Sequence, residues 1–287
     1  MNNDMEYSAG DCDLHLHTIV SDAEITPIEI LNCAKELNLE KISITDHDAV
    51  GAYIYFEYDL FTKAKEMGIT VITGIELDSY YSDVEIHVLG YGIDIKNKEL
   101  NDYLSQVHVP RRLKIEDQVE KINHFYKKEV IRKDEIFILH RDTMMKPHLV
   151  HALLKKGLFS EYKEASRWLS ANAKSEVKVP KPSVAEMIHL VKKAGGEAFL
   201  AHPGYFMLEN NLDLDKMIKE LEPQGLNGLE VEYPYFHTSP KFQSREVETE
   251  IINFLYQTAR KYNLKTSRGS DAHQLHQMVS FNKPDII

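Results

Sequence analysis

The chain has 287 residues, 43% of them hydrophobic and 28% charged, and a formal net charge of −11. This balance excludes a disordered chain, and no apolar run approaches the roughly 18 residues of a membrane-spanning helix or forms the apolar segment of a secretion signal. The acidic charge argues against a surface that grips long nucleic acid, and two cysteines without a CxxC pair exclude a disulfide framework, so we expect a cytoplasmic protein.

Short apolar runs rich in β-branched residues recur along the chain, and helical patterns separate most of them. This spacing predicts βα units and a mainly parallel sheet or barrel. The predicted strands are residues 12–16, 41–45, 70–75, 85–91, 197–201, 228–232 and 265–267.

Three helices between these strands have clear sequence signals. Residues 26–29, Thr-Pro-Ile-Glu, form a capping box with proline at the first helical position, and residues 183–186, Ser-Val-Ala-Glu, repeat the box. A third helix is expected from about residue 246 to 262 by its apolar periodicity. The side chains expected to face inward are Ile251, Phe254, Leu255 and Ala259.

The stretch from about residue 100 to 182 breaks this rhythm. It is rich in Lys, Glu and Leu, looks mostly helical, and separates the fourth predicted strand from the fifth. We expect an inserted helical subdomain that ends at the stiff Val-Pro-Lys-Pro segment of residues 179–182. Basic pairs in this stretch, such as Arg111-Arg112, are expected to lie on solvated helix faces.

Most predicted strands lead into residue types that bind metals. His15 and His17 share one face because side chains alternate along a strand, and Asp22 follows in the adjoining loop. Ligands at the carboxyl ends of parallel strands would converge on one mouth. The other candidates of this kind are His47, Glu76, His87, His202, Asp271 and His273.

Each candidate alone also has an ordinary interpretation. A single HxH can be structural, and His87 or His202 can be a core histidine with satisfied hydrogen bonds. Their joint placement favours a metal site, because independent core histidines have no reason to fall at successive strand ends. Imidazole and carboxylate ligands suit zinc, manganese or iron, and the lack of thiolates argues against a closed structural zinc site.

Six motifs occur in order along the chain: DLHLHT-x-x-SD, ITDHD, GIE, IHVLGY, AHPG and GSDAH. Together they resemble the PHP (polymerase and histidinol phosphatase) family of metal-dependent phosphoesterases. The closest resemblance is to the stand-alone bacterial branch that acts on nucleoside 3′,5′-bisphosphates and short oligonucleotides, which also carries a helical insertion. The resemblance covers roughly residues 11–99 and 183–273. It implies an α/β fold, a distorted (β/α)7 barrel formed by residues 1–99 and 183–287, with residues 100–182 as the inserted helical subdomain.

The resemblance also implies two or three divalent ions, either manganese, zinc or iron. The implied ligands are His15, His17, Glu76 and Asp271 for a first ion, His87 and His202 with a bridging Glu76 for a second, and Asp22, His47 and His273 for a third. Three divalent ions against three carboxylates would leave a pocket of about +3 that attracts a phosphoryl group. A metal-bridged hydroxide could then serve as the nucleophile without a nucleophilic side chain.

Three further carboxylates, Asp13, Asp46 and Asp48, either orient imidazoles from outside the ligand set or cap loops.

Substrate contacts are expected from the insertion. In the related branch an Arg-Pro-His sequence there resembles a phosphate-binding element, and here it reads Lys146-Pro147-His148. Lysine offers a point charge where arginine offers a two-pronged donor. Arg268 is another candidate, and any of these residues could instead be an ordinary surface group. Aromatic residues within 233–237 could stack on a base or simply pack as a rigid loop on the barrel rim.

The sequence therefore predicts a metal-dependent phosphoesterase that hydrolyses a small, nucleotide-like phosphomonoester, such as a nucleoside 3′,5′-bisphosphate or a short oligonucleotide. A histidinol-phosphate phosphatase is the alternative within the same chemistry. A non-catalytic metal-binding regulatory module is the alternative from another class, and the intact ligand set disfavours it. An amidohydrolase also uses histidines at barrel strand ends, but no lysine is obviously placed as its bridging ligand.

Overall fold

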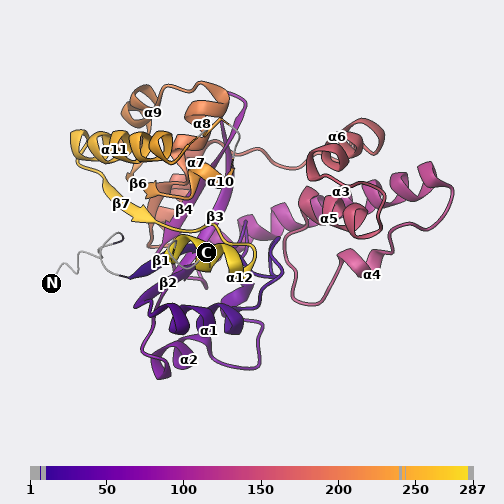
Figure 1. Cartoon of the computed structure of the whole chain (residues 1–287), viewed down its shortest axis with the longest axis horizontal. Helices are drawn as coiled ribbons and strands as arrows, with labels where there is room; N and C mark the ends of the chain where they lie inside the picture. The colour runs from indigo at the N-terminus through magenta and orange to yellow at the C-terminus, as the bar shows by residue number, and fades with distance from the viewer. Residues whose placement is uncertain (1–6, 8–10, 239–240, 243, 284–287) are drawn as a thin grey trace.

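The computed structural model describes residues 7, 11–238, 241–242 and 244–283 (Figure 1). Its centre is a curled sheet of seven strands that lie side by side in sequence order. Their bounds are β1 (Cys12–Leu16), β2 (Lys41–Ile44), β3 (Thr70–Tyr81), β4 (Val84–Tyr91), β5 (Glu197–Leu200), β6 (Leu226–Glu232) and β7 (Lys265–Arg268). The sheet curls far enough that Leu16, at the end of β1, forms a parallel bridge with Ala272 just after β7. The fold is thus an α/β half-barrel.

The sheet is mainly parallel, as predicted, and β4 is the exception. This strand runs antiparallel to both of its neighbours, β3 and β5, while the other four pairings are parallel. The cause is local: Ser82 and Asp83, which join β3 to β4, both have positive φ angles of 49° and 65°. Two such residues make the tight turn that suits a hairpin. As a result, β3 continues to Tyr81, well past its predicted end at residue 75.

The helix starts predicted from capping boxes are confirmed. Helix α1 (Pro27–Leu37) begins after Thr26, whose side chain accepts from Glu29 N, and α7 (Val184–Lys193) begins in the same way after Ser183. Helix α11 (Arg245–Lys261) buries Leu255 and Ala259 as expected. Phe254, however, is 46% exposed, because its position on the helix turns it towards solvent.

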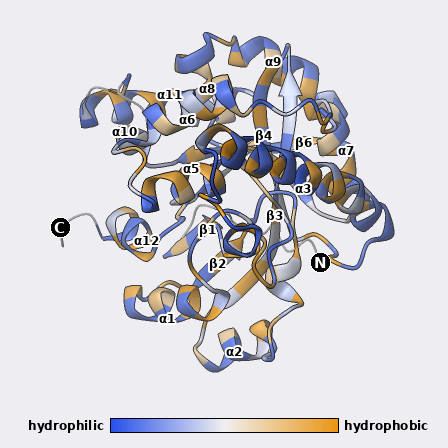
Figure 2. Ribbon diagram, turned by 90° about the vertical axis from the view of Figure 1, so that its right-hand side faces the viewer, coloured by the Kyte–Doolittle hydropathy of each residue, from blue (hydrophilic) through white to orange (hydrophobic). Residues whose placement is uncertain are grey.

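Two hydrophobic clusters pack these helices against the sheet. One includes residues of α7, α9 (Leu214–Leu221) and α11, and the other includes residues of α1, α2 (Leu60–Glu66) and α12 (Leu275–Asn282). Figure 2 shows hydrophobic and hydrophilic residues mixed along α1 and α7, the pattern of helices with one buried face. The remaining short elements are η1 (Gly51–Tyr53), α8 (Pro203–Asn210), η2 (Glu222–Gln224) and α10 (Tyr235–Thr238).

Five helices lie between β4 and β5 in the sequence, and the first four of them extend to one side of the sheet (Figure 1). These four are α3 (Lys98–Tyr126), α4 (Lys133–Ile136), α5 (Lys146–Lys155) and α6 (Tyr162–Asn172). The second half of α3 packs with α5 and α6 in a hydrophobic cluster that contains no residue of a strand, whereas Leu100 and Leu104 at its start belong to the sheet's own core. Helix α3 therefore connects the two parts. Within the described residues, no helix has the length and apolar character needed to cross a bilayer.

Candidate metal centre

All nine candidate ligands lie at one mouth of the curled sheet. Six of them are in β1 or in loops directly after a strand: His15, His17, Asp22, His47, Asp271 and His273. His202 follows β5 in the same way. The other two candidate ligands belong to the β3–β4 hairpin. Glu76 lies in the middle of β3 and His87 lies within β4, so neither is at the end of a parallel strand. His87 is paired in register with Asp78, two residues beyond Glu76.

Glu76 is the centre of the cluster. Its Oε2 lies 3.1 Å from His15 Nε2, 3.2 Å from His17 Nε2 and 3.3 Å from His47 Nε2. Its Oε1 lies 2.9 Å from His87 Nδ1 and 3.3 Å from His202 Nε2. The two oxygens of one buried carboxylate therefore face two separate sets of imidazoles.

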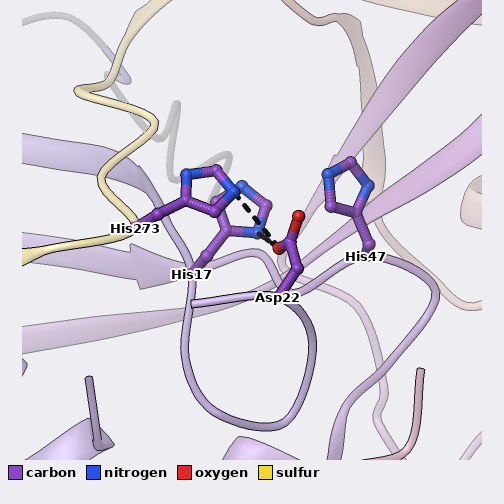
Figure 3. Close-up of side chains that lie close together, drawn as sticks. All are labelled: His17, Asp22, His47 and His273. Carbon is purple, nitrogen blue, oxygen red and sulfur yellow. Dashed lines mark ion pairs between the residues drawn. The ribbon is translucent and has the colours of Figure 1, made fainter. Parts of the chain in front are cut away.

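Three sets of these side chains bring their ligand atoms within 4.8 Å of one another. The sets are His15, His17, Glu76 and Asp271; His17, Asp22, His47 and His273; and His47, Glu76 and His87. In the second set the His17 and His273 rings stack 4.4 Å apart, and Asp22 Oδ1 lies 3.1 Å from His273 Nε2 (Figure 3). A fourth set, Asp78, Glu85 and His87, overlaps the third at His87.

The imidazoles and carboxylates of the cluster shift one another's pKa values in the directions that keep both kinds of group charged. Burial lowers the pKa of His17, but the carboxylates of Asp271 and Glu76, which lie 3.0 and 3.2 Å from its Nε2, outweigh this effect and raise that pKa to about 9. Burial likewise opposes the charges of Glu76, Asp78 and Asp22 at His47, whose pKa also rises to about 9. Burial would raise the pKa of Glu76, yet the surrounding imidazoles hold it well below its usual range. A divalent cation could replace these protons as the positive charge at the centre of the cluster.

One buried ring nitrogen supports this fit to divalent ions. His17 Nε2 lies 3.0 Å from Asp271 Oδ1 and 3.2 Å from Glu76 Oε2, but neither contact has the geometry of a hydrogen bond. Leaving a buried polar atom unpaired is costly, and a metal ion is one partner that accepts its lone pair. The donor set is imidazole and carboxylate with no thiol, which suits zinc, manganese or iron.

Backbone strain gathers at the same place. His202 and Asp271 have φ angles of 33° and 52°, in the left-handed region that residues other than glycine rarely adopt. Such residues concentrate at functional sites, where the surrounding structure holds them in place.

Carboxylates outside the cluster orient two of its imidazoles. His15 Nδ1 donates to Glu230 Oε1 at 2.9 Å, and His47 Nδ1 donates to Asp78 Oδ1 at 2.9 Å. Glu230 is fully buried on β6 and also accepts from the backbone N–H of His202 at 2.8 Å. Glu230 and Asp78 were not among the residues predicted from the sequence. For Glu230 a signal was present, because the alternation Leu229-Glu230-Val231-Glu232 places two acids on one face of the strand.

Asp13 and Asp46, two of the three carboxylates expected either to orient imidazoles or to cap loops, do the latter. Asp13 accepts from the backbone N–H of Ser270 at 2.9 Å, and Asp46 accepts from the backbone N–H of Thr18 at 2.7 Å. Asp48 is paired with Arg111 of α3. They hold together the loops that carry the candidate ligands.

The predicted substrate contacts lie in three different environments. Lys146 is exposed, and its Nζ donates to Ser170 Oγ at 2.8 Å. His148 is 8% exposed, with Nε2 2.9 Å from the carbonyl oxygen of Ser21, and burial together with nearby Arg141 lowers its pKa to about 4. Arg268 donates to Glu232 Oε2 at 3.0 Å and lines a cavity beside the metal cluster.

This cavity has a volume of about 1070 Å³. Its wall includes His87, His202, Asp271 and His273 from the cluster, as well as Tyr162 from the start of α6. Helix α6 thus contributes to the wall of the cavity, together with residues that follow the strands.

Among the aromatic residues after β6, Tyr233 lines the cavity and donates to Asp271 Oδ2 at 2.9 Å. Tyr235 is buried in the rim, where its hydroxyl accepts from Gly204 N. The side chain of His237, also considered for stacking, lies outside the described residues.

Known proteins resemble this chain in sequence and in fold. The PHP domain family matches residues 13–181. The chain is 25% identical over 266 residues to the 5′-3′ exoribonuclease Rnm of Salmonella typhimurium, covering 91% of this chain and 85% of that protein. It is 22% identical over 262 residues to the 3′,5′-nucleoside bisphosphate phosphatase of Chromobacterium violaceum, covering 91% and 86%.

A solved structure from Bifidobacterium adolescentis, provisionally assigned as a metal-dependent phosphoesterase, superposes with a TM-score of 0.76 at 26% identity, covering 94% of this chain and 90% of that one. The family match spans more than half of the chain, and it includes the residues of the cluster from His15 to His87. The chain therefore belongs to the PHP domain family and is a metal-dependent phosphoesterase.

Proposed function

We propose that the protein hydrolyses a small, nucleotide-like phosphomonoester, either a nucleoside 3′,5′-bisphosphate or the end of a short oligonucleotide. The observation that carries the proposal is the position of Glu76, whose two oxygens face separate sets of imidazoles. Divalent ions bound there would supply an activated water and charge to stabilise the phosphoryl oxygens. We propose manganese, zinc or iron as the ion.

The proposed ligands keep the grouping that the resemblance implies. Glu76 lies between the sets and would be shared by two ions, while Glu230 and Asp78 would keep His15 and His47 in their orientations. The complete proposed set is His15, His17, Asp22, His47, Glu76, His87, His202, Asp271 and His273. Four of these nine line the large cavity, so a phosphoryl group that enters it meets the cluster directly.

The cavity supports a substrate larger than a simple phosphate ester. At about 1070 Å³ it lies at the upper end of the range for pockets that hold small organic ligands. Tyr162, Tyr205 and Phe281 on its wall offer flat faces on which a base could stack. Two relatives, an exoribonuclease and a nucleoside bisphosphate phosphatase, are named for nucleotide substrates. The net charge of −11 favours short substrates over long strands, which bind through many Lys and Arg contacts.

We further propose that residues 100–182 form an inserted helical subdomain that roofs the cavity. Tyr162 at the start of α6 supports this role, since it lines the cavity beside His202. A second phosphate would be met by Arg268, Lys146 and His148. Arg268 already lines the cavity, whereas Lys146 and His148 would exchange their contacts with Ser170 and Ser21 for the phosphate.

A phosphate-release screen tests the substrate assignment. Chelator-treated protein is reloaded with Mn²⁺ and compared on a nucleoside 3′,5′-bisphosphate, short oligonucleotides, histidinol phosphate and an aryl phosphate. We expect the highest kcat/KM on the bisphosphate or the short oligonucleotide, and no activity without the ion. Preference for histidinol phosphate would favour the alternative phosphatase, and faster cleavage of long single strands would overturn the proposal.

A pair of variants tests the second-phosphate contacts. Replacing Lys146 and His148 together by alanine should weaken hydrolysis of the bisphosphate and leave that of the aryl phosphate nearly unchanged. Lys155→Ala, an exposed change on the same helix, is the matched control. Equal losses on both substrates would show that these two residues serve folding or chemistry.

A further inference from the structure

Arg111 of helix α3 is a buried cation beside the metal cluster. It is 8% exposed, although its neighbour Arg112 is largely exposed, pairs with Glu116 one turn away and lies over the ring of Phe137. Its Nη2 donates to Asp48 Oδ2 and, at 2.8 Å, to Asp78 Oδ2. Burying an arginine against two carboxylates carries a large desolvation cost, so such a group needs every partner it has.

Asp78 connects this arginine to the candidate ligand His47. One oxygen of Asp78 accepts from Arg111, and the other accepts from His47 Nδ1 at 2.9 Å. With Nδ1 donating, the lone pair of His47 is on Nε2, which lies 3.3 Å from Glu76 Oε2 at the centre of the cluster. The orientation of the His47 ring is thus fixed from the side away from the proposed ions.

The backbone at His47 and Asp48 is held by the same helical part of the chain. Thr143 Oγ1 donates to the carbonyl oxygen of His47 at 2.6 Å, and His108 Nε2 donates to the carbonyl oxygen of Asp48 at 2.7 Å. Asp48 itself accepts from the backbone N–H of Asp78 at 3.3 Å. Arg111 therefore closes a ring of contacts that links the turn after β2, strand β3 and helix α3.

We propose that Arg111 is a positioning residue, which holds His47 in the orientation of a metal ligand by clamping Asp78 and Asp48. The inference rests on the proposed role of His47 as a ligand. With this role for Arg111, helix α3 supports the metal site, while α6 forms part of the wall of the cavity.

The competing explanation is that Arg111 only neutralises buried charge. Two variants separate the explanations. Arg111→Met leaves Asp48 and Asp78 without their cation, whereas Arg111→Met combined with Asp48→Asn removes one charge of each sign and restores the original buried net charge. Arg112→Met is the matched control on the same helix, and His47→Ala reports the loss of the ligand itself.

The measurement is calorimetric titration of chelator-treated protein with Mn²⁺, together with the Tm of each metal-free variant. We expect the double variant to recover the Tm lost in Arg111→Met but to bind the ion at the His47 set about 10–100-fold more weakly than the unaltered protein. His47→Ala should lose that ion, and Arg112→Met should bind as the unaltered protein does.

Two outcomes would overturn the inference in different ways. Unaltered Mn²⁺ affinity in the double variant, with loss of the ion in His47→Ala, would show that Arg111 serves charge balance alone and would leave the proposed ligands intact. Unaltered affinity in His47→Ala would remove His47 from the ligand set, and both the ligand assignment and the positioning role would fail.

Discussion

Replacing Glu76 by glutamine tests the centre of the proposed mechanism with little change in shape. The substitution removes the negative charge and turns one of the two oxygens into an NH₂ group. Since Oε2 faces three imidazole nitrogens within 3.3 Å and Oε1 faces two, either orientation of the amide presents NH₂ to one set of ligands. An NH₂ group cannot bind a cation, so at least one ion loses its shared carboxylate.

The expected loss is large. Stabilisation of the transition state by a metal ion amounts to several kcal/mol, so losing a shared ligand should lower kcat by about 1000-fold, equivalent to about 4 kcal/mol. The assay is phosphate release from a nucleoside 3′,5′-bisphosphate with Mn²⁺, alongside the Mn²⁺ content of the same preparation. Glu197→Gln is the control, because Glu197 pairs with Lys265 at the far end of β5 from His202. A Glu76→Gln protein with an unchanged rate would refute the reasoning.

Three further predictions concern pH, outer contacts and packing. The raised pKa values of His17 and His47, about 9 against an ordinary 6.5, stabilise the metal-free fold fully below pH 6.5, and this contribution is lost as pH rises through about 9. The Tm of metal-free protein should therefore fall across this window while its affinity for Mn²⁺ rises, and a rising Tm would contradict this. Glu230→Gln should weaken Mn²⁺ binding in a titration by about 10–100-fold, because Glu230 orients His15; an unchanged affinity would exclude that role. Gly269→Ala would place its Cβ 2.2 Å from His15 Cβ, so urea unfolding should show a loss of about 1–3 kcal/mol, and unaltered stability would mean that the turn shifts freely.

The candidate ligands could be predicted from the sequence because most of them occupy short turns attached to strands. Once the strands are placed in order, the topology brings residues such as His47 and Asp271 to the same mouth. The direction of β4 could not be predicted in this way. It depends on the turn at Ser82 and Asp83, which lacks the glycine that normally marks a hairpin.

Arg111 shows where reasoning from local pattern fails. It sits in a basic pair on a polar helix, and nothing in the adjacent residues distinguishes it from Arg112. Successive residues on a helix point about 100° apart, so one of the two can face the sheet while the other faces water. Which one does so depends on how α3 lies across β3, and Asp48 and Asp78 determine that contact from distant parts of the chain.

The pairing of Leu16 with Ala272 has a consequence for how the protein is made. During synthesis β1 leaves the ribosome before the other six strands, but its outer edge has no neighbour until the segment after β7 has emerged. Joining two such distant segments is slow, and the open edge is exposed to pairing with other chains during the delay. Asp271 and His273 arrive with the same last segment. A nascent chain that stalls before this point therefore lacks both the contact that closes the sheet and part of its proposed metal set, and it can load the full set of ions only after residues 271–273 have been made.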